Sequence, residues 1–352
     1  MLSGRCLRAA QIVRTIEGLP AEALKKGRVL LLGILLLIPG IVVSAAAQEE
    51  MGGTAMKHGR LHVEGTLLKD ARGETVTLKG VSTHGINWYP DYVNEDAFRT
   101  LRDEWGVDLI RLAMYTEEYN GYCAGGDREA LKEVVRRGVE AATELGMYVI
   151  IDWHILSDGN PEQHQDEAAE FFDEMSRLYG GHTNVIYEVC NEPNGDVTWE
   201  QVKAYAEKII GVIRANDAEN LILVGSPTWS QRVDLAAANP ITGYENILYT
   251  LHFYAATHKA PLRLVLERAV GAGLPVFVSE FGICDASGNG VLDKDQAEAW
   301  IRLLKEKGVS YVIWNLSNKD ERSALLKKDA ASLCGFPDEE LNEQGLWYKY
   351  LE

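Results

Sequence analysis

Short apolar runs alternate with longer amphipathic stretches along most of the chain. Eight runs have the length and the β-branched or aromatic content of buried strands: residues 77–83, 109–114, 148–153, 185–190, 221–225, 247–253, 275–280 and 311–315. The stretches between them repeat apolar residues every three or four positions and predict helices over residues 94–105, 127–145, 166–179, 198–215, 261–272 and 293–307. Strands separated by helices need crossover connections, which produce parallel sheets.

This alternation predicts an α/β fold. Strand–helix units in this number close most simply into a (β/α)8 TIM barrel, a fold that uses about 250 residues. A doubly wound open sheet is the alternative, but no strand is followed by the glycine-rich phosphate loop of nucleotide-binding sheets. Ahead of the barrel, residues 61–79 alternate apolar and polar positions around Lys69-Asp70-Ala71-Arg72-Gly73 and predict an N-terminal β-hairpin with its turn there.

The beginning of the chain resembles an export segment. Basic residues precede an apolar run over residues 29–43, and small residues follow at Ser44-Ala-Ala-Ala47. A signal peptide cleaved near Ala47 and an uncleaved membrane anchor are both open, because the run nears the length that spans a bilayer. We therefore expect a signal peptide or membrane anchor over residues 1–47, a polar spacer over 48–59, the (β/α)8 barrel over 60–352, and a secreted or membrane-anchored protein.

The net charge indicates which classes of partner the protein can bind, and the cysteine content indicates whether it has a zinc site or disulfides. The 35 Lys and Arg residues and 52 Asp and Glu residues give a net charge of −17. A field of this sign repels phosphate backbones, which argues against nucleic acid and favours a neutral or cationic partner. Beyond the export segment, Cys123, Cys190, Cys284 and Cys334 remain, without a Cys-x-x-Cys pair. We expect neither a structural zinc site nor an obligatory disulfide framework.

Polar residues end nearly every predicted strand. They are Ser82-Thr83-His84, Arg111, Asp152-Trp153-His154, Asn191-Glu192-Pro193, His252-Phe253-Tyr254, Ser279-Glu280 and Trp314-Asn315. In a barrel these ends meet at one mouth, where active sites lie. Glu192 and Glu280 suit glycosidic cleavage, in which one carboxyl group donates a proton and the other is ionised. Arg111 would keep one of them ionised, and the histidines would orient the groups.

Five of these segments resemble a known family in its own order. They are Ile186-Tyr187-Glu188-Val189-Cys190-Asn191-Glu192-Pro193, Val278-Ser279-Glu280-Phe281-Gly282, Asp152-Trp153-His154, Leu251-His252-Phe253-Tyr254 and Ile313-Trp314-Asn315-Leu316-Ser317-Asn318-Lys319. From about Leu61 onward the chain is similar to glycoside hydrolase family 5, and within it to the bacterial endoglucanase (cellulase) branch. The resemblance implies a retaining double displacement with Glu192 as the acid/base and Glu280 as the nucleophile.

The resemblance also implies roles for the neighbouring residues. Asn191 would bond the sugar 2-hydroxyl, Arg111 and Tyr254 would flank the nucleophile, and His252 would help set the protonation of the acid/base. The residues expected to bind sugar are His84, Trp88, Tyr89, His154, Trp314, Lys319 and Glu321. Tyr115 and Trp229 are open between substrate contact and packing at the rim. Glu188, inside a strand, is expected to support Arg111 or a histidine, and Trp105, Trp153 and Trp300 are expected in the core.

The function expected is that of a secreted endo-β-1,4-glucanase, monomeric, acting on β-1,4-linked glucan without cofactor, metal or obligate protein partner. An endo-β-mannanase, a xylanase and a xyloglucanase remain alternatives, because the catalytic pair does not encode the sugar. A metal-dependent barrel hydrolase would use His84, Asp152, His154 and His252. A non-catalytic glycan-binding protein would have no use for two facing carboxylates.

Overall fold

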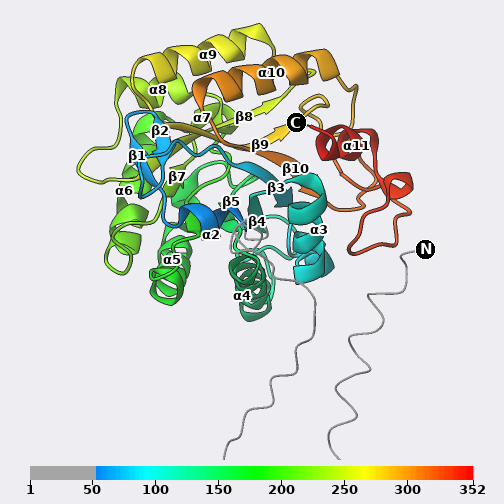
Figure 1. Ribbon diagram of the computed structural model, residues 1–352. Coiled ribbons are helices and arrows are strands. Elements are labelled where there is room, and N and C mark those ends of the chain that lie inside the picture. Colours follow the sequence, from blue (N-terminus) through cyan, green and yellow to red (C-terminus); the bar gives the residue numbers. More distant parts are fainter. Residues whose placement is uncertain (1–52, 352) are drawn as a thin grey trace, which may run out of the picture. The chain divides into compact units, whose positions relative to one another are not determined.

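The computed structural model describes residues 53–351, and the predicted export segment lies outside the described residues. Eight parallel strands form a closed barrel in the order β10-β3-β4-β5-β6-β7-β8-β9 (Figure 1). They are β3 (Lys79–Thr83), β4 (Leu109–Tyr115), β5 (Tyr148–His154), β6 (Val185–Glu188), β7 (Ile222–Val224), β8 (Ile247–Tyr254), β9 (Val276–Gly282) and β10 (Tyr311–Leu316). The predicted (β/α)8 barrel is confirmed.

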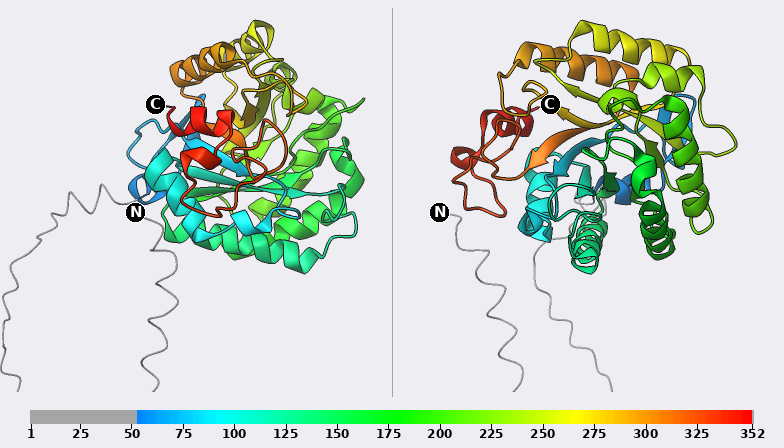
Figure 2. Two further views of the ribbon diagram at one scale, coloured as in Figure 1. Left: turned by 90° about the vertical axis from the view of Figure 1, so that its right-hand side faces the viewer. Right: turned by 180° about the vertical axis from the view of Figure 1, so that it is seen from behind.

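Helices cover the outside of the strands (Figure 2). The predicted ones are α3 (Glu95–Trp105), α4 (Arg128–Glu144), α5 (Gln165–Tyr179), α6 (Trp199–Arg214), α9 (Ala260–Gly271) and α10 (Lys294–Lys307). The short helices α7 (Pro227–Ser230), α8 (Val233–Ala238) and α11 (Glu343–Lys349), and the 3-10 turns η3 (Pro90–Tyr92), η4 (Pro161–His164) and η5 (Asp338–Glu340), were not predicted. They are too short to show a helical period.

Side-chain caps explain where the longer helices begin. Asn94 accepts a hydrogen bond from the Ala97 amide, as its position predicts. Thr198 and Gln201 form a reciprocal capping box at the start of α6. At the other end of α3, Gly106 adopts the left-handed conformation (φ 64°), which ends the helix before β4 begins.

The barrel floor is apolar and its mouth is polar. Leu109, Ile150, Leu223 and Phe277 belong to a buried cluster in the lower part of the barrel. Because side chains of a strand alternate between faces, Arg111 lies on the same face of β4 as Leu109, two residues nearer the carboxyl end. The polar side chains that point into the barrel therefore lie above this apolar cluster, toward the carboxyl ends of the strands.

The N-terminal hairpin differs from the prediction in the place of its turn. Strands β1 (His62–Glu64) and β2 (Leu67–Lys69) pair antiparallel across Gly65, which has φ 61°. The predicted turn at residues 69–73 exists, since the Gly73 amide donates to the Asp70 carbonyl at 2.9 Å, but it is the second of two. The prediction missed the first because Gly65 was taken as part of a strand; its positive φ suits a turn.

The predicted polar spacer over residues 48–59 is wrong for its second half. Helix α2 (Thr54–His58) occupies residues 54–58, and the Ala55 amide donates to the Gly146 carbonyl at 2.8 Å. Ala55 is buried, so this helix is part of the domain. Among the residues that the structure describes, no helix is long and apolar enough to cross a membrane.

Candidate active site

The strand ends surround a cavity of about 570 Å³ at the mouth of the barrel. Most of the predicted site residues line it: His84, Tyr115, His154, Glu192, Trp229, His252, Tyr254, Glu280, Trp314, Lys319 and Glu321. A larger cavity of about 780 Å³ lies at the other end of the barrel, beside the β1–β2 hairpin, and contains none of them. Glu192 and Glu280 both line the smaller cavity, at the carboxyl ends of the strands. That cavity is therefore the candidate active site.

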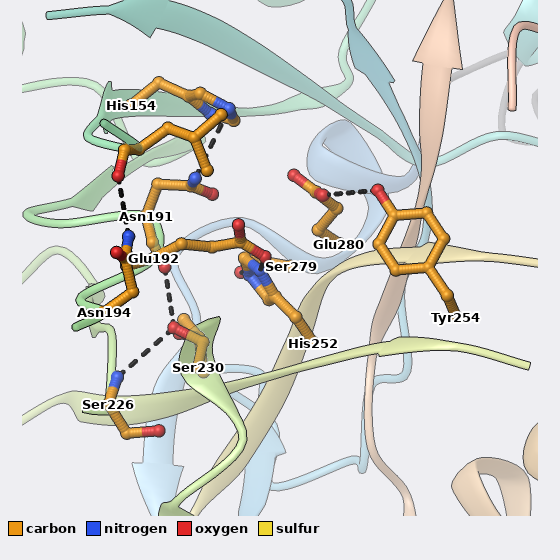
Figure 3. Close-up of polar contacts among 12 residues, drawn as sticks. His154, Asn191, Glu192, Asn194, Ser226, Ser230, His252, Tyr254, Ser279 and Glu280 are labelled. Carbon is orange, nitrogen blue, oxygen red and sulfur yellow. Dashed lines mark hydrogen bonds and ion pairs between the residues drawn. The ribbon is translucent and has the colours of Figure 1, made fainter. Parts of the chain in front are cut away.

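Glu192 and Glu280 face each other across this cavity (Figure 3). Glu192 follows β6, and Glu280 lies near the end of β9. A carboxylate oxygen of each lies within 4.8 Å of the other. Their exposed fractions are 8% and 4%, so both are largely shielded but open to the cavity. Two residues 88 positions apart in the sequence thus meet as the strand-end pattern predicts.

Arg111 organises the polar groups beneath Glu280. Its Nη1 atom lies 3.1 Å from Glu280 Oε2, its Nε atom 2.7 Å from Glu188 Oε2, and its Nη2 atom 2.6 Å from Asn191 Oδ1 and 3.0 Å from Asp152 Oδ2. Burial opposes the charge of this arginine, but the three carboxylates outweigh burial and raise its pKa. The guanidinium is therefore a permanent positive charge within reach of Glu280.

Two buried carboxyl groups beside Arg111 have opposite pKa shifts. Burial raises the pKa of Asp152 well above its usual range. Burial also acts on Glu188, but the charge of Arg111 outweighs it and lowers the pKa of Glu188 to about 2. Glu188 is therefore an ionised support for Arg111, as predicted for a carboxylate inside a strand.

Tyr254 holds the other oxygen of Glu280. Its hydroxyl donates to Glu280 Oε1 at 2.8 Å (Figure 3). Burial, followed by the charges of Glu280 and Glu192, raises the pKa of the phenol well above its usual range, so the group stays a neutral donor. Both oxygens of Glu280 thus accept hydrogen bonds from fixed donors, which hold its carboxyl group in one orientation.

His252 connects the other glutamate to the buried network. Its Nδ1 atom lies 2.9 Å from Glu192 Oε1, and its Nε2 atom lies 2.9 Å from Ser279 Oγ. The Ser279 hydroxyl in turn donates to Glu188 Oε1 at 2.7 Å. Burial lowers the pKa of His252, but the carboxylates of Glu188 and Glu192 outweigh burial and raise it to about 9.

Aromatic rings form the wall beside the glutamates. The His154 and Trp314 rings stack with centroids 5.1 Å apart and an interplanar angle of 13°, and the His84 ring lies 5.1 Å from Trp314. The Trp88 ring lies 4.8 Å from Tyr115. Burial is the main cause that lowers the pKa of His84 to about 2 and of His154 to about 3, so both imidazoles are neutral.

Four predicted residues do not line the cavity. Trp88 packs on Tyr115, and the Tyr89 ring lies 5.0 Å from His84, so both lie beside the cavity wall. Arg111 and Asn191 are fully buried beneath it. Asn191 is already bonded: its Nδ2 atom donates to the Ile155 carbonyl at 3.0 Å and lies 3.3 Å from His154 Nε2.

Other cavity residues were not predicted. They come from loops beyond the strand ends: Leu156, Thr228, Gln231, His258, Ala286, Ser287, Gly288 and Ser323. In that region Lys319 Nζ lies 2.7 Å from Glu321 Oε2 and 3.2 Å from His84 Nε2, which joins the loop after β10 to the wall. The only sequence signal for such residues is that their loops follow catalytic strands.

The groups required by a metal-dependent hydrolase do not assemble. Within residues 53–351, no three of His84, Asp152, His154 and His252 bring ligand atoms within 4.8 Å of one another. The carboxylate–histidine groups that do so are Glu192, His252 and Glu280 at the mouth, and His58, Asp70 and Glu74 at the hairpin. The mouth is thus organised around the two glutamates.

Comparison with known protein families identifies the family of the chain. The family model "Cellulase (glycosyl hydrolase family 5)" matches residues 69–320. The chain belongs to glycosyl hydrolase family 5, and it is a glycoside hydrolase. The predicted family and enzyme class are therefore confirmed.

Several curated proteins are similar to the chain. It is 50% identical over 293 residues to endoglucanase A of Butyrivibrio fibrisolvens, covering 82% of this chain and 68% of that protein. It is 47% identical over 292 residues to an endoglucanase of Clostridium saccharobutylicum, covering 83% and 64%, and 44% identical over 320 residues to endoglucanase N of Pectobacterium atrosepticum, covering 90% and 70%. The chain thus spans about two thirds of the length of these relatives.

Solved structures show the same likeness. The catalytic domain of an endoglucanase of Thermobifida fusca superposes with a TM-score of 0.80 at 36% identity, covering 85% of this chain and 98% of that domain. A variant of that domain in complex with cellotetraose matches with a TM-score of 0.80 at 35% identity and the same coverage.

Proposed function

We propose that the protein is an endo-β-1,4-glucanase that cleaves internal bonds of β-glucan with retention of anomeric configuration. The observation that carries this proposal is the approach of the Glu192 and Glu280 carboxylates to within 4.8 Å. Retaining enzymes place their carboxyl groups about 5–5.5 Å apart, whereas inverting enzymes leave roughly 6.5–9.5 Å for a water molecule.

The environments of the two glutamates support different roles. Glu280, held between Arg111 and Tyr254, is the nucleophile that attacks the anomeric carbon. Glu192, bonded to His252, gives its proton to the departing glycosidic oxygen. Once the glycosyl–enzyme has formed, Glu192 takes a proton from the water that attacks the anomeric carbon and releases Glu280.

The cavity supports a neutral glucan as substrate. Trp314, Tyr115 and the two neutral imidazoles offer ring faces for the C–H surfaces of sugars and ring nitrogens for their hydroxyls. Relatives named endoglucanases, and cellotetraose in a related structure, favour glucan over mannan, xylan and xyloglucan. In this role Lys319 and Glu321 would bond sugar hydroxyls further along the cleft.

The direct test compares soluble β-glucan, mannan and xylan under identical conditions. We expect cleavage within β-glucan chains, followed as a rapid fall in viscosity, with the β-anomer of the new reducing end appearing first in NMR spectra. Glu280→Gln should abolish turnover on all substrates. Faster cleavage of mannan or xylan, or initial formation of the α-anomer, would refute the corresponding part of the proposal.

We also propose that the protein acts outside the cytoplasm. The support is the order of basic, apolar and small residues in positions 1–47. N-terminal sequencing of the protein recovered from culture medium and from membranes distinguishes the two forms. A mature end near Gln48 in the medium indicates cleavage, and an intact leader in the membrane fraction indicates an anchor.

A further inference from the structure

The last three residues of the short segment α7, which follows β7, have a backbone conformation that L-residues rarely adopt and that is not that of a regular helix. Thr228, Trp229 and Ser230 have φ values of 60°, 53° and 54°. None of them is glycine, and left-handed backbone is disfavoured for every other residue type. A run of this kind persists only where the surroundings determine it.

The hydroxyl of Ser230 is the centre of the bonds that hold this turn. The residue is fully buried. Its Oγ atom donates to the Asn191 carbonyl at 2.6 Å and accepts from the Ser226 amide at 3.2 Å (Figure 3). Thr250 Oγ1 lies 3.2 Å away and supplies a further donor. The donor and both acceptor positions of the hydroxyl are therefore occupied.

The turn forms hydrogen bonds to the chain on both sides of Glu192. Ser230 holds the carbonyl of Asn191, just before the glutamate, and the Trp229 amide donates to the carbonyl of Pro193, just after it, at 3.0 Å. Both contacts come from left-handed residues, so the disfavoured backbone is what brings the two donors to these carbonyls.

Neighbouring residues make further contacts with the segment that contains Glu192. Asn194 Nδ2 donates to the Glu192 carbonyl at 2.9 Å and to the Leu156 carbonyl at 2.6 Å. At position 225, a Cβ atom would clash with the Cys190 carbonyl, so Gly225 allows the end of β7 to lie directly against this segment. Every backbone carbonyl from Asn191 to Pro193 is thereby bonded.

We propose that Ser230 is a positioning residue that holds the Asn191–Glu192 peptide so that the Glu192 carboxyl group meets the glycosidic oxygen. The inference rests on the proposed acid/base role of Glu192. The physical reason is that the Glu192 carboxylate is held by His252 at one oxygen, so its place across from Glu280 depends on where its backbone is fixed. An error of about 1 Å in such a group lowers rates roughly 100-fold.

The experiment uses the full-length protein and aryl β-cellobiosides that differ only in the leaving group. Ser230→Ala removes the hydroxyl and keeps the disfavoured backbone. Ser230→Gly removes the hydroxyl and also the steric cost of the left-handed backbone. The inference can therefore still be tested if the alanine variant does not fold. Ser310→Ala is the matched control, because Ser310 is a buried serine at the floor of the barrel whose hydroxyl accepts from the Leu78 amide at 2.9 Å.

With a poor leaving group, which needs the acid, we expect Ser230→Ala and Ser230→Gly to lower kcat/KM by roughly 10- to 100-fold. With an activated leaving group the loss should stay within about threefold, because protonation is then not required. The pH profile should change only for the poor leaving group. Ser230→Gly should melt at a higher temperature than Ser230→Ala, since glycine accepts the left-handed backbone.

Glu192→Gln, measured in parallel, separates this inference from the proposed function. If Glu192→Gln spares the activated substrate but the Ser230 variants lose both substrates equally, Ser230 is only structural and the inference is refuted. The same conclusion follows if the Ser230 variants behave like Ser310→Ala. If Glu192→Gln itself shows no difference between leaving groups, the acid/base role of Glu192 fails, and the positioning role fails with it.

Discussion

The Nδ1 atom of His252 lies 2.9 Å from the Oε1 atom of Glu192, and the other nitrogen of the same ring lies 2.9 Å from Ser279 Oγ. The Ser279 hydroxyl donates onward to Glu188, so it accepts from His252. Nε2 of His252 is therefore a donor, and because the nearby carboxylates outweigh burial and raise the pKa of the ring to about 9, the ring is an imidazolium at neutral pH, in which Nδ1 also donates. The proposed acid/base therefore has a cation as its neighbour at neutral pH.

This relationship predicts a loss of stability at alkaline pH. The pKa of His252 is raised to about 9 in the folded protein, against about 6.5 in an unfolded chain. The folded state thus holds a proton that the unfolded state releases, so its contribution is complete below about pH 6.5 and disappears as the pH rises through about 9. His252→Asn should flatten the fall in Tm across this window, measured by calorimetry. Parallel curves for the two proteins would contradict a raised pKa.

Arg111 should be necessary for stability as well as for activity. Its removal leaves the buried carboxylates of Glu188 and Glu280 without their cation. We expect Arg111→Met to lower the free energy of unfolding by about 3–5 kcal/mol, the usual cost of breaking a buried ion pair, and to abolish turnover. Arg111→Lys should also be inactive, because an ammonium group cannot reproduce the planar fork.

Urea unfolding measures the effect of the Arg111 variants. Arg177→Met is the control, because Arg177 is exposed and its pair with Asp173 lies on the surface of α5; this change should cost about 1 kcal/mol or less. An Arg111→Met protein that unfolds like the control variant would show that the buried carboxyl groups accept protons without penalty.

Tyr254→Phe tests the contribution of one hydrogen bond to the proposed nucleophile. The change removes the donor that lies 2.8 Å from Glu280 Oε1 and little else. Hydrogen bonds to charged groups contribute about 1.5–3 kcal/mol, so kcat should fall by about tenfold or more while the protein stays folded. Single-turnover measurements of glycosyl–enzyme formation should show the loss in that step. A normal rate there, with slow release of product, would assign the hydroxyl to another step.

The fold and the polar mouth were predictable because both depend on periodic patterns. Strand ends of a parallel barrel converge whatever the loops do, so Glu192, Glu280 and His252 had to lie close together once the strands were found. The role of Glu188 followed from the cost of burying a charge without a partner.

The sequence could not reveal the contacts that hold these groups in place. Ser230 contacts Asn191 because three consecutive non-glycine residues adopt the left-handed backbone. None of these residue types favours that conformation, so the sequence gives no signal for it. Gln231 and His258 reach the cavity from loops whose course depends on packing against neighbouring loops. The hairpin shows the same limit on a smaller scale, since the pattern predicted the turn that contains Gly73 but not the one that contains Gly65.

His154 should destabilise the protein in acid, opposite in direction to His252. Burial, and then the charge of Arg111, lowers its pKa to about 3, while an unfolded histidine binds a proton below about pH 6.5. Between these values the unfolded state binds the extra proton, so the contribution of His154 to stability is present above about pH 6.5 and is lost as the pH falls toward 3.

The measurement is the free energy of unfolding in urea at about pH 7 and about pH 4. His154→Gln lowers stability at both values because it disturbs the stack on Trp314, but it should reduce the loss on acidification, since glutamine does not titrate. Ile155→Val, at a buried neighbouring position, should cost about 0.5–1.5 kcal/mol equally at both values. If His154→Gln loses as much stability on acidification as the wild type, the ring accepts a proton in the folded state, and a neutral sugar-binding imidazole is the wrong description.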